Sequence, residues 1–437
     1  MKMAVRKILV CCMMFTVSLV FAPWSVLGSG LESGGIGARG RAMGSAMIAV
    51  ADDWTAVSYN PAGLVQIQGS QWALVCNFFS GGMESTESLR NLPVFSNPDP
   101  ARGDFIDPIG DEPRSFNENS VGADITSGEF GYASGKGRFA FGVGFYGSGA
   151  GSGWDDGIQT SSGDDISAEI SFVNASVNVP LALAYRVADN LSLGVTVALR
   201  YGLLDADINK VREGTTGYSM KTSQETDGFG ISADVGALWS VSRVVSLGAV
   251  ARLPYTIEKT GETTVENSLA PLSVSSGTTV REHIPLRLGV GVALRPNKKN
   301  IIAFSMTRLN WSDYDREIEY DDPVPFILED SSGNPADWED TMVYNLGYEG
   351  LISERWTLRG GLTYDEAPEP PEARTLVGGQ VLDVWKFSVG TGYRLKKTEL
   401  NLGYTHTYGQ EDEGYIPGAQ YEIALHEIYV GIVRKFR

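Results

Sequence analysis

Cysteine, histidine and basic side chains are scarce in this chain of 437 residues. It has three cysteines and three histidines, and its 35 Lys and Arg are outnumbered by 53 Asp and Glu, for a formal net charge of −18. Nucleic acid is therefore not an expected partner, because neutralising phosphates requires a basic surface. Beyond the first 30 residues the chain also lacks any run of about 18 apolar residues, the length that a membrane-spanning helix needs.

Glycine, in contrast, is abundant. It accounts for 52 of the 437 residues, about 12 %, against a typical ~7 %, and this excess argues against a helical protein because glycine destabilises helix interiors. Mean hydropathy is −0.08. A membrane β-barrel is compatible with that value, since its strands alternate between apolar and polar residues.

The N-terminus has the pattern of a secretory signal peptide. Basic residues at its start precede an apolar stretch over 8–22, and small residues lie around Gly28 and Ser29. We expect cleavage after Gly28, so that residues 1–28 are the signal and 437 − 28 = 409 residues remain. Two of the three cysteines leave with the signal, and Cys76 then has no partner for an internal disulfide.

The strongest pattern in the remaining chain is a period of two. From Val173 to Tyr185 the odd positions are apolar and the even ones mostly small or polar, and the alternation resumes from Leu191 to Tyr201 after a short turn. Such a pattern predicts β-strands with one apolar face. Strands of a soluble sandwich usually have ~5–6 residues. Several here are much longer, which favours a lipid-facing wall with aromatic residues near its edges.

Fourteen candidate strands lie between residues 71 and 436, joined by connections that alternate between short turns and long loops. The long loops are predicted at 81–118, 149–168, 205–219, 259–276, 320–340, 367–380 and 410–419. This alternation is typical of an outer-membrane barrel with tight periplasmic turns and extended outer loops. We therefore predict an all-β fold, a fourteen-stranded antiparallel transmembrane β-barrel over residues 71–437.

A barrel of this size needs some filler. Eight strands leave room only for side chains and sixteen to eighteen enclose an aqueous channel, so fourteen should enclose a lumen. Residues 29–70 precede the first strand, are rich in glycine and are too short to build a core of their own. We predict that residues 29–70 form an N-terminal hatch, a plug inside the barrel.

Several short elements in the sequence are distinctive. Residues 37–46 read GARGRAMGSA, residues 51–53 read ADD and residues 59–64 read YNPAGL. Farther along, residues 285–292 read PLRLGVGV and residues 356–365 read WTLRGGLTYD. With these elements the chain resembles the FadL-type outer-membrane transport proteins, which carry long-chain fatty acids and other hydrophobic molecules.

The resemblance implies a fourteen-stranded barrel with a hatch, in which outer loops capture the ligand, a lumen pocket holds it, and a gap at a kinked third strand releases it sideways. It also places the hatch turn Asn60, Pro61 and Ala62 near that gap. The third predicted strand has Gly142 and Gly144 on its non-lipid face. Two interpretations of these glycines stay open, because glycine permits a bend and is also ordinary on a barrel interior.

Arginines occupy the polar phase of several strands and are expected to face the lumen. In one interpretation they pair with lumen or hatch carboxylates such as Glu32, Asp52 and Asp53. In the other, one or two of them hold the anionic head group of a ligand. The candidates are Arg200, Arg252 and Arg359, which lie farther from the periplasmic turns than the others.

Other candidate sites receive little support. Residues 35–40 spell G-x-G-x-x-G, but no strand precedes them and no βαβ unit surrounds them. His283, His406 and His426 lie within strand patterns as wall histidines, and nothing near His406 indicates a serine hydrolase. Clustered loop carboxylates form either a solvated acidic rim or a divalent-cation site. We predict no catalytic residue, no cofactor and no metal site.

The expected function is passive outer-membrane transport of hydrophobic compounds, among them long-chain fatty acids, and not catalysis. Expected partners are a fatty acid or hydrocarbon ligand, outer-membrane lipid and lipopolysaccharide, and the protein is expected to be a monomer that crosses the bacterial outer membrane many times. Two alternatives stay open. One is a non-transporting barrel of the same superfamily that acts as a scaffold or secretion partner. The other is a general porin, which the hatch disfavours.

Overall fold

The computed structural model describes residues 35–86, 125–159, 165–213, 218–268, 272–325, 327–334, 337–370, 382–411 and 420–436. The predicted signal peptide 1–28, the first part of the predicted hatch, 29–34, and most of the predicted loop 81–118 lie outside these residues.

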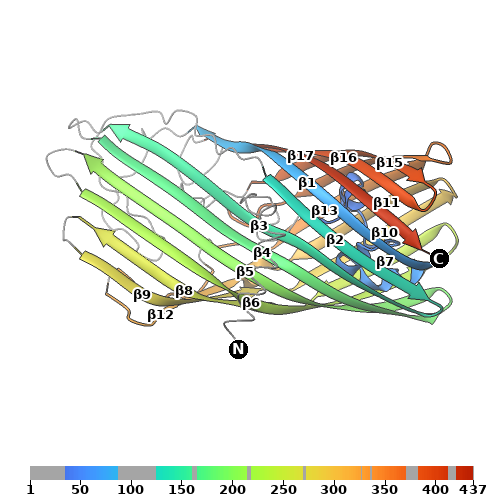
Figure 1. Ribbon diagram of the computed structural model, residues 1–437, viewed down its shortest axis with the longest axis horizontal. Helices are drawn as coiled ribbons and strands as arrows, with labels where there is room; N and C mark the ends of the chain where they lie inside the picture. The colour runs from blue at the N-terminus through green and yellow to red at the C-terminus, as the bar shows by residue number, and fades with distance from the viewer. Residues whose placement is uncertain are drawn as a thin grey trace.

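The wall is one antiparallel sheet that closes on itself, because β1 pairs with both β2 and β17 (Figure 1). Its segments are β1 (Gly69–Thr86), β2 (Ile125–Lys136), β3 (Phe139–Gln159), β4 (Asp165–Ala188), β5 (Leu191–Glu213), β6 (Tyr218–Ser240), β7 (Val245–Arg252), β8 (Tyr255–Asn267), β9 (Leu272–Ile284), β10 (Arg287–Asn297), β11 (Asn300–Leu309), β12 (Asp315–Tyr320), β13 (Thr341–Leu351), β14 (Trp356–Asp365), β15 (Val384–Leu395), β16 (Thr398–Glu411) and β17 (Gln420–Phe436).

Three neighbouring wall strands are each divided into two segments. Leu253 and Pro254 separate β7 from β8, Pro285 and Leu286 separate β9 from β10, and the 3-10 helix η4 (Trp311–Asp313) lies between β11 and β12. Proline interrupts a ladder because it has no N–H to donate. The 17 segments therefore make 17 − 3 = 14 wall strands, which confirms the predicted fourteen-stranded antiparallel barrel.

The apolar side chains of the wall point outward. Leu181 and Leu183 of β4 are 56 % and 57 % exposed, whereas Ala182 and Ala184 beside them are buried. This arrangement is the reverse of a soluble protein, and it is what a wall surrounded by lipid requires. The period of two in the sequence thus identifies the outer face of the strands.

Three of the predicted long loops are wrong, because the strands continue far beyond the apolar band. β3 extends to Gln159 and β4 begins at Asp165, within the predicted loop 149–168. In the same way β5, β6, β8 and β9 extend through most of the predicted loops 205–219 and 259–276. Polar residues occupy both faces of these extensions, so hydrophobicity no longer alternates even though the backbone ladder continues.

Residues 35–68, which we call the inner segment, lie inside the wall at the end of the barrel that holds the C-terminus (Figure 1). The segment contains α2 (Ala38–Ala42), α3 (Ala56–Tyr59) and the 3-10 helix η1 (Pro61–Gln66). It supplies most of one buried apolar cluster among the described residues, including Trp54. No helix in the described residues is long and apolar enough to cross a membrane.

The inner segment meets the wall backbone to backbone. A Cβ on Gly194 of β5 would lie 2.4 Å from the backbone N of Ala62, and a Cβ on Gly361 of β14 would lie 2.0 Å from the backbone N of Gly44. Only glycine permits so close an approach. Part of the glycine excess in the sequence is therefore explained by contact between the wall and the inner segment.

Candidate ligand site in the lumen

A polar cavity of about 60 Å³ lies beside the inner segment. Its lining consists of Gly35, Ser45, Ile48, Ser58 and Tyr59 from the inner segment and Tyr146, Arg200, Arg252, Arg287, Ser305, Thr307, Leu309, Val343, Asn345, Thr363, Asp365 and Lys386 from the wall. Four of these side chains are cationic and one is a carboxylate. A cavity needs about 10–15 Å³ of such volume to hold one water molecule, so this one has room for a few water molecules or a small polar group.

Arg200 of β5 is held in the cavity wall by neutral hydrogen-bond partners. It is 4 % exposed, its Nε donates to Ser232 Oγ at 2.9 Å, and its Nη1 donates to Asn178 Oδ1 at 2.8 Å. Its guanidinium carbon lies 4.6 Å from the centroid of the Tyr255 ring. Within the described part of the chain no carboxylate forms an ion pair with Arg200. A buried cation with neutral partners is costly, so an arriving anion would be stabilised here.

Two other cations of the cavity are paired with carboxylates. Nε and Nη2 of Arg252 donate to the two oxygens of Asp234 at 2.9 and 3.1 Å. Lys386 Nζ donates to Asp365 Oδ2 at 2.7 Å. These pairs keep the charges in place at the edge of the cavity, but each cation already has an anionic partner.

Tyr59 contributes a neutral hydroxyl to the cavity lining. Its Oη accepts a hydrogen bond from the backbone N of Ile36 at 2.9 Å and donates to the carbonyl oxygen of the same residue at 3.1 Å. Burial raises the pKa of Tyr59 to about 12. The phenol therefore stays protonated at physiological pH and adds no negative charge to the cationic cavity.

Arg359, the third arginine predicted as an anion ligand, does not line this cavity. Its Nε donates to Glu349 Oε2 at 2.7 Å, its Nη2 to Glu399 Oε1 at 2.9 Å and its Nη1 to Asn401 Oδ1 at 2.6 Å. Glu349 also accepts two hydrogen bonds from Arg39 of the inner segment, at 2.7 and 2.9 Å. The geometry favours the pairing interpretation for Arg359, as part of an ionic link between the wall and the inner segment.

Asn60 fixes the turn at the start of η1. Its Nδ2 donates to the carbonyl oxygens of Ile48 and Ala237 at 2.8 and 3.0 Å, and its Oδ1 accepts from the backbone N of Ala62 at 3.2 Å. Pro61 takes the first position of η1, where its missing N–H has no cost. The turn is bonded to β6 through Asn60 and faces β5 through Ala62.

β3 loses part of its pairing on both sides at one level of the wall. Its ladder with β2 ends at Phe145, although β2 remains paired with β1 as far as Ile125. Its ladder with β4 skips Gly144 and Phe145, next to Pro180. Among the described residues, β3 beyond Phe145 has no pairing with β2, and Figure 1 shows β3 continuing past the start of β2.

Gly142 and Gly144 face the inner segment at this level. A Cβ on Gly142 would lie 2.6 Å from Val57 Cγ1 and 3.2 Å from Leu64 Cδ2, and a Cβ on Gly144 would lie 3.2 Å from Val57 Cγ2 and 3.1 Å from Pro180 Cγ. Close packing against the inner segment therefore accounts for both glycines. They lie where the pairing of β3 with β2 and β4 is interrupted.

Comparison with known proteins places this architecture in a family. The family model described as "Outer membrane protein transport protein (OMPP1/FadL/TodX)" matches residues 27–420. The chain belongs to this family. As a member of the OMPP1/FadL/TodX family it is a protein of the bacterial outer membrane, as predicted. No curated protein sequence matches the chain.

Solved structures of FadL and TodX relatives share the fold. A FadL homologue from Pseudomonas aeruginosa has 16 % identity and a TM-score of 0.67, over 96 % of this chain and 100 % of that one. The toluene transporter TbuX of Ralstonia pickettii has 18 % identity and a TM-score of 0.65, over 92 % and 99 %. The toluene transporter TodX of P. putida has 16 % identity and a TM-score of 0.65, over 93 % and 100 %.

In this FadL-family barrel the predicted site residues fall into separate places. Arg200 and Arg252 line one cavity, whereas Arg359 belongs to the link with the inner segment. Neither Lys386, which lines the same cavity as Arg200, nor Tyr255, whose ring lies beside the Arg200 guanidinium, was predicted as a site residue. Lys386 could have been predicted to face the lumen, because it lies between the outward aromatic residues Trp385 and Phe387 of β15.

Proposed function

We propose that this barrel carries hydrophobic compounds with an anionic head group, such as long-chain fatty acids, passively across the outer membrane as a monomer. The observation that carries the proposal is Arg200, a buried guanidinium that lines the lumen cavity and has only neutral partners among the described residues. A carboxylate in the cavity would supply the missing charge, and hydrogen bonds between charged groups are the strong ones. No bond is made or broken, so the protein is not an enzyme.

The surroundings of Arg200 support an amphipathic ligand. Leu309 lines the cavity and belongs to an apolar cluster with Tyr255, Trp311 and Tyr314. In the proposed bound state the head group lies against Arg200, while the hydrocarbon follows these apolar side chains. A neutral hydrocarbon such as toluene would leave the buried cation uncompensated.

The proposed exit is lateral, at the level where β3 is unpaired from β2. The inner segment blocks the axial route in this proposal, and its residues Val57 and Leu64 face β3 there. Asn60, Pro61 and Ala62 then act by holding η1 against β5 and β6, and Gly142 and Gly144 act by letting the inner segment approach β3. Release into the apolar layer of the membrane needs only a gradient of affinity along the path.

The test is ligand binding by the purified barrel in detergent, with an eighteen-carbon fatty acid and with toluene as probes. Arg200→Gln removes the charge and keeps hydrogen-bonding capacity. A charged hydrogen bond contributes about 1.5–3 kcal/mol, so fatty-acid affinity should fall roughly 10- to 150-fold, while toluene affinity stays within about twofold. Arg200→Lys should retain part of the affinity because it keeps the positive charge.

Arg186→Gln is the matched control, because Arg186 is an arginine of the wall that donates to the Val65 carbonyl oxygen and does not line the cavity. Equal fatty-acid affinity in the wild type, Arg200→Gln and Arg186→Gln would refute the proposed head-group site. Tight toluene binding without fatty-acid binding would indicate a neutral hydrocarbon ligand. Co-purification of a large partner complex with no bound acyl chain would support the scaffold alternative.

A further inference from the structure

β8, β9 and β12 form a three-stranded extension beyond the interruptions in the wall, at the end opposite the inner segment (Figure 1). Glu282 and Ile284 of β9 are buried, at 3 % and 6 % exposed. Successive side chains of a strand point to opposite faces, so Arg281 and His283 lie on the other, outward face of the extension. This face lies past Pro285, on the water side of the apolar band.

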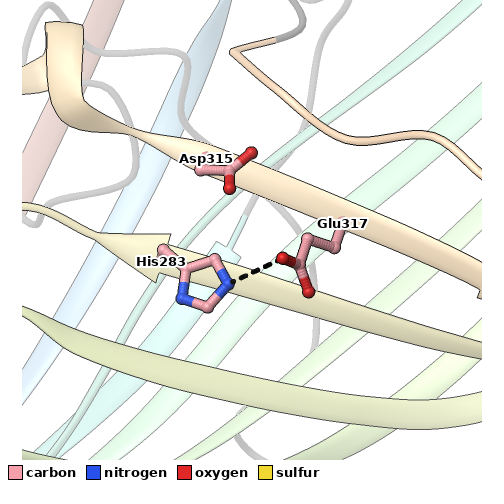
Figure 2. Close-up of side chains that lie close together, drawn as sticks. All are labelled: His283, Asp315 and Glu317. Carbon is pink, nitrogen blue, oxygen red and sulfur yellow. Dashed lines mark ion pairs between the residues drawn. The ribbon is translucent and has the colours of Figure 1, made fainter.

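Two carboxylates meet His283 on that face. Asp315 of β12 is the direct cross-strand partner of His283, and Glu317 follows two residues later on the same side of β12. His283 Nε2 lies 3.7 Å from Glu317 Oε1 (Figure 2). One ligand atom from each of the three residues lies within 4.8 Å of the other two, and among the described residues this is the one group of three His, Cys, Asp or Glu side chains so arranged.

The side chain of His283 is oriented by a neighbouring strand. Its Nδ1 is hydrogen-bonded to Thr256 Oγ1 of β8 at 2.8 Å. This contact leaves Nε2 directed at the carboxylates, and a hydrogen bond to the second ring nitrogen is the usual partner of a metal-ligating histidine. Asp315 is held too, since its Oδ1 accepts a hydrogen bond from the backbone N of Gly333 at 2.7 Å.

The charges around the group are unbalanced. Arg281 pairs with Glu258 and Glu319 at 2.8 Å each, and it lies farther from Glu317, at 3.5 Å. The four carboxylates around Arg281 and His283 are Glu258, Asp315, Glu317 and Glu319, so this group with one guanidinium has a charge of −4 + 1 = −3 when His283 is neutral. The arginine is already shared between two other carboxylates, so Glu317 and Asp315 have the least cationic compensation.

We propose that His283, Asp315 and Glu317 bind one divalent transition-metal ion, with Zn²⁺ as the best match. One imidazole nitrogen and two carboxylate oxygens suit Zn²⁺, whereas Ca²⁺ requires six to eight oxygen ligands. Tetrahedral bonds of about 2.1 Å place ligand atoms roughly 3.4 Å apart. Side-chain rotation brings the present spacing to that value, and a water molecule completes the coordination.

The metal would join β9 to β12 directly after the break in the wall. Trp311 and Tyr314, which immediately precede β12, pack with Trp338 in an aromatic cluster, at ring-centroid distances between 4.9 and 5.9 Å. Leu309 belongs to the same apolar cluster and lines the lumen cavity. Metal binding on the outer face would therefore stiffen the apolar lining of the lumen.

The experiment is a Zn²⁺ titration of the purified full-length barrel in detergent, in competition with a chromophoric chelator. We expect one equivalent of Zn²⁺ in the wild type and at least a tenfold loss of affinity in His283→Gln. Asp315→Asn serves as a second variant and should show a similar loss. Circular dichroism of the strand signal verifies that each variant is folded.

Glu319→Gln is the matched control, because Glu319 lies on the outward face of β12, carries the same charge as Glu317 and is outside the group of three. Its Zn²⁺ affinity should stay within about twofold of the wild type. The same loss in Glu319→Gln as in His283→Gln would overturn the proposal in favour of a diffuse acidic surface. Absence of Zn²⁺ binding at micromolar concentrations in the wild type would overturn it outright.

Discussion

Removing one carboxylate should detach the inner segment from the wall. Glu349 of β13 accepts hydrogen bonds from Arg39 of the inner segment and from Arg359 of β14. In Glu349→Gln both arginines lose this partner, although Arg39 keeps its pairs with Asp52 and Asp53. Because some compensation remains, the free energy that holds the inner segment to the wall should fall by about 2–3 kcal/mol. Leaving a buried charge with no partner at all would cost more, about 3–5 kcal/mol.

That loss corresponds to a roughly 30- to 150-fold larger population of the detached state, at about 1.4 kcal/mol per tenfold change. The assay is single-channel ion conductance in planar bilayers, where the frequency of open events should rise by this factor. Deletion of residues 29–70 gives the upper limit of conductance. Glu399→Gln is the control, because it removes an equal charge from Arg359 without touching the inner segment. Equal opening frequencies in Glu349→Gln and Glu399→Gln would refute the reasoning.

Two further perturbations test the contact between the wall and the inner segment. Gly194→Ala inserts a Cβ 2.4 Å from the backbone of Ala62, so the free energy of unfolding measured by thermal denaturation should fall by about 1–3 kcal/mol. Gly360→Ala is the control, because its Cβ would meet nothing closer than 4.0 Å. It should lower the free energy of unfolding by less than half as much. Tyr59 has its pKa raised from 10 to about 12 in the folded protein, so its contribution to stability is present below pH 10 and is lost as the pH rises from 10 to 12. Denaturant titrations over that interval should show this loss in the wild type and a flatter profile in Tyr59→Phe, and parallel profiles would contradict it.

The barrel itself could be predicted from the sequence because its signal is local. Alternation within one strand, as from Val173 to Tyr185, is enough to identify a lipid-facing side and to count strands. The signal disappears where both faces become polar, and the extensions of β3 and β8 were therefore mistaken for loops. Strand pairing continues there through backbone hydrogen bonds, which leave no trace in side-chain hydrophobicity.

For the candidate sites, alternation along a strand predicts only which face of the wall each residue occupies. The alternation shows that Arg200 and Arg359 both face inward, but their roles depend on residues from other strands. Arg200 meets Asn178 and Ser232, whereas Arg359 meets two carboxylates. For the same reason no metal site was predicted at His283, since its proposed co-ligands come from a strand about thirty residues away and meet it through the register of the sheet.

The three interrupted wall strands have a mechanical consequence. Their breaks lie in neighbouring strands, so they form one crease across the sheet, and Pro254 and Pro285 keep it open because neither can donate to a ladder. A sheet flexes more readily along a line where its ladder is interrupted, and here single bonds, from Leu253 N to the Ala233 carbonyl oxygen and from Asn310 N to the Leu286 carbonyl oxygen, bridge that line. β8, β9 and β12 thus form an outer section beyond the crease, and bending there is limited on one side because the unbroken strand β6 pairs with both β7 and β8.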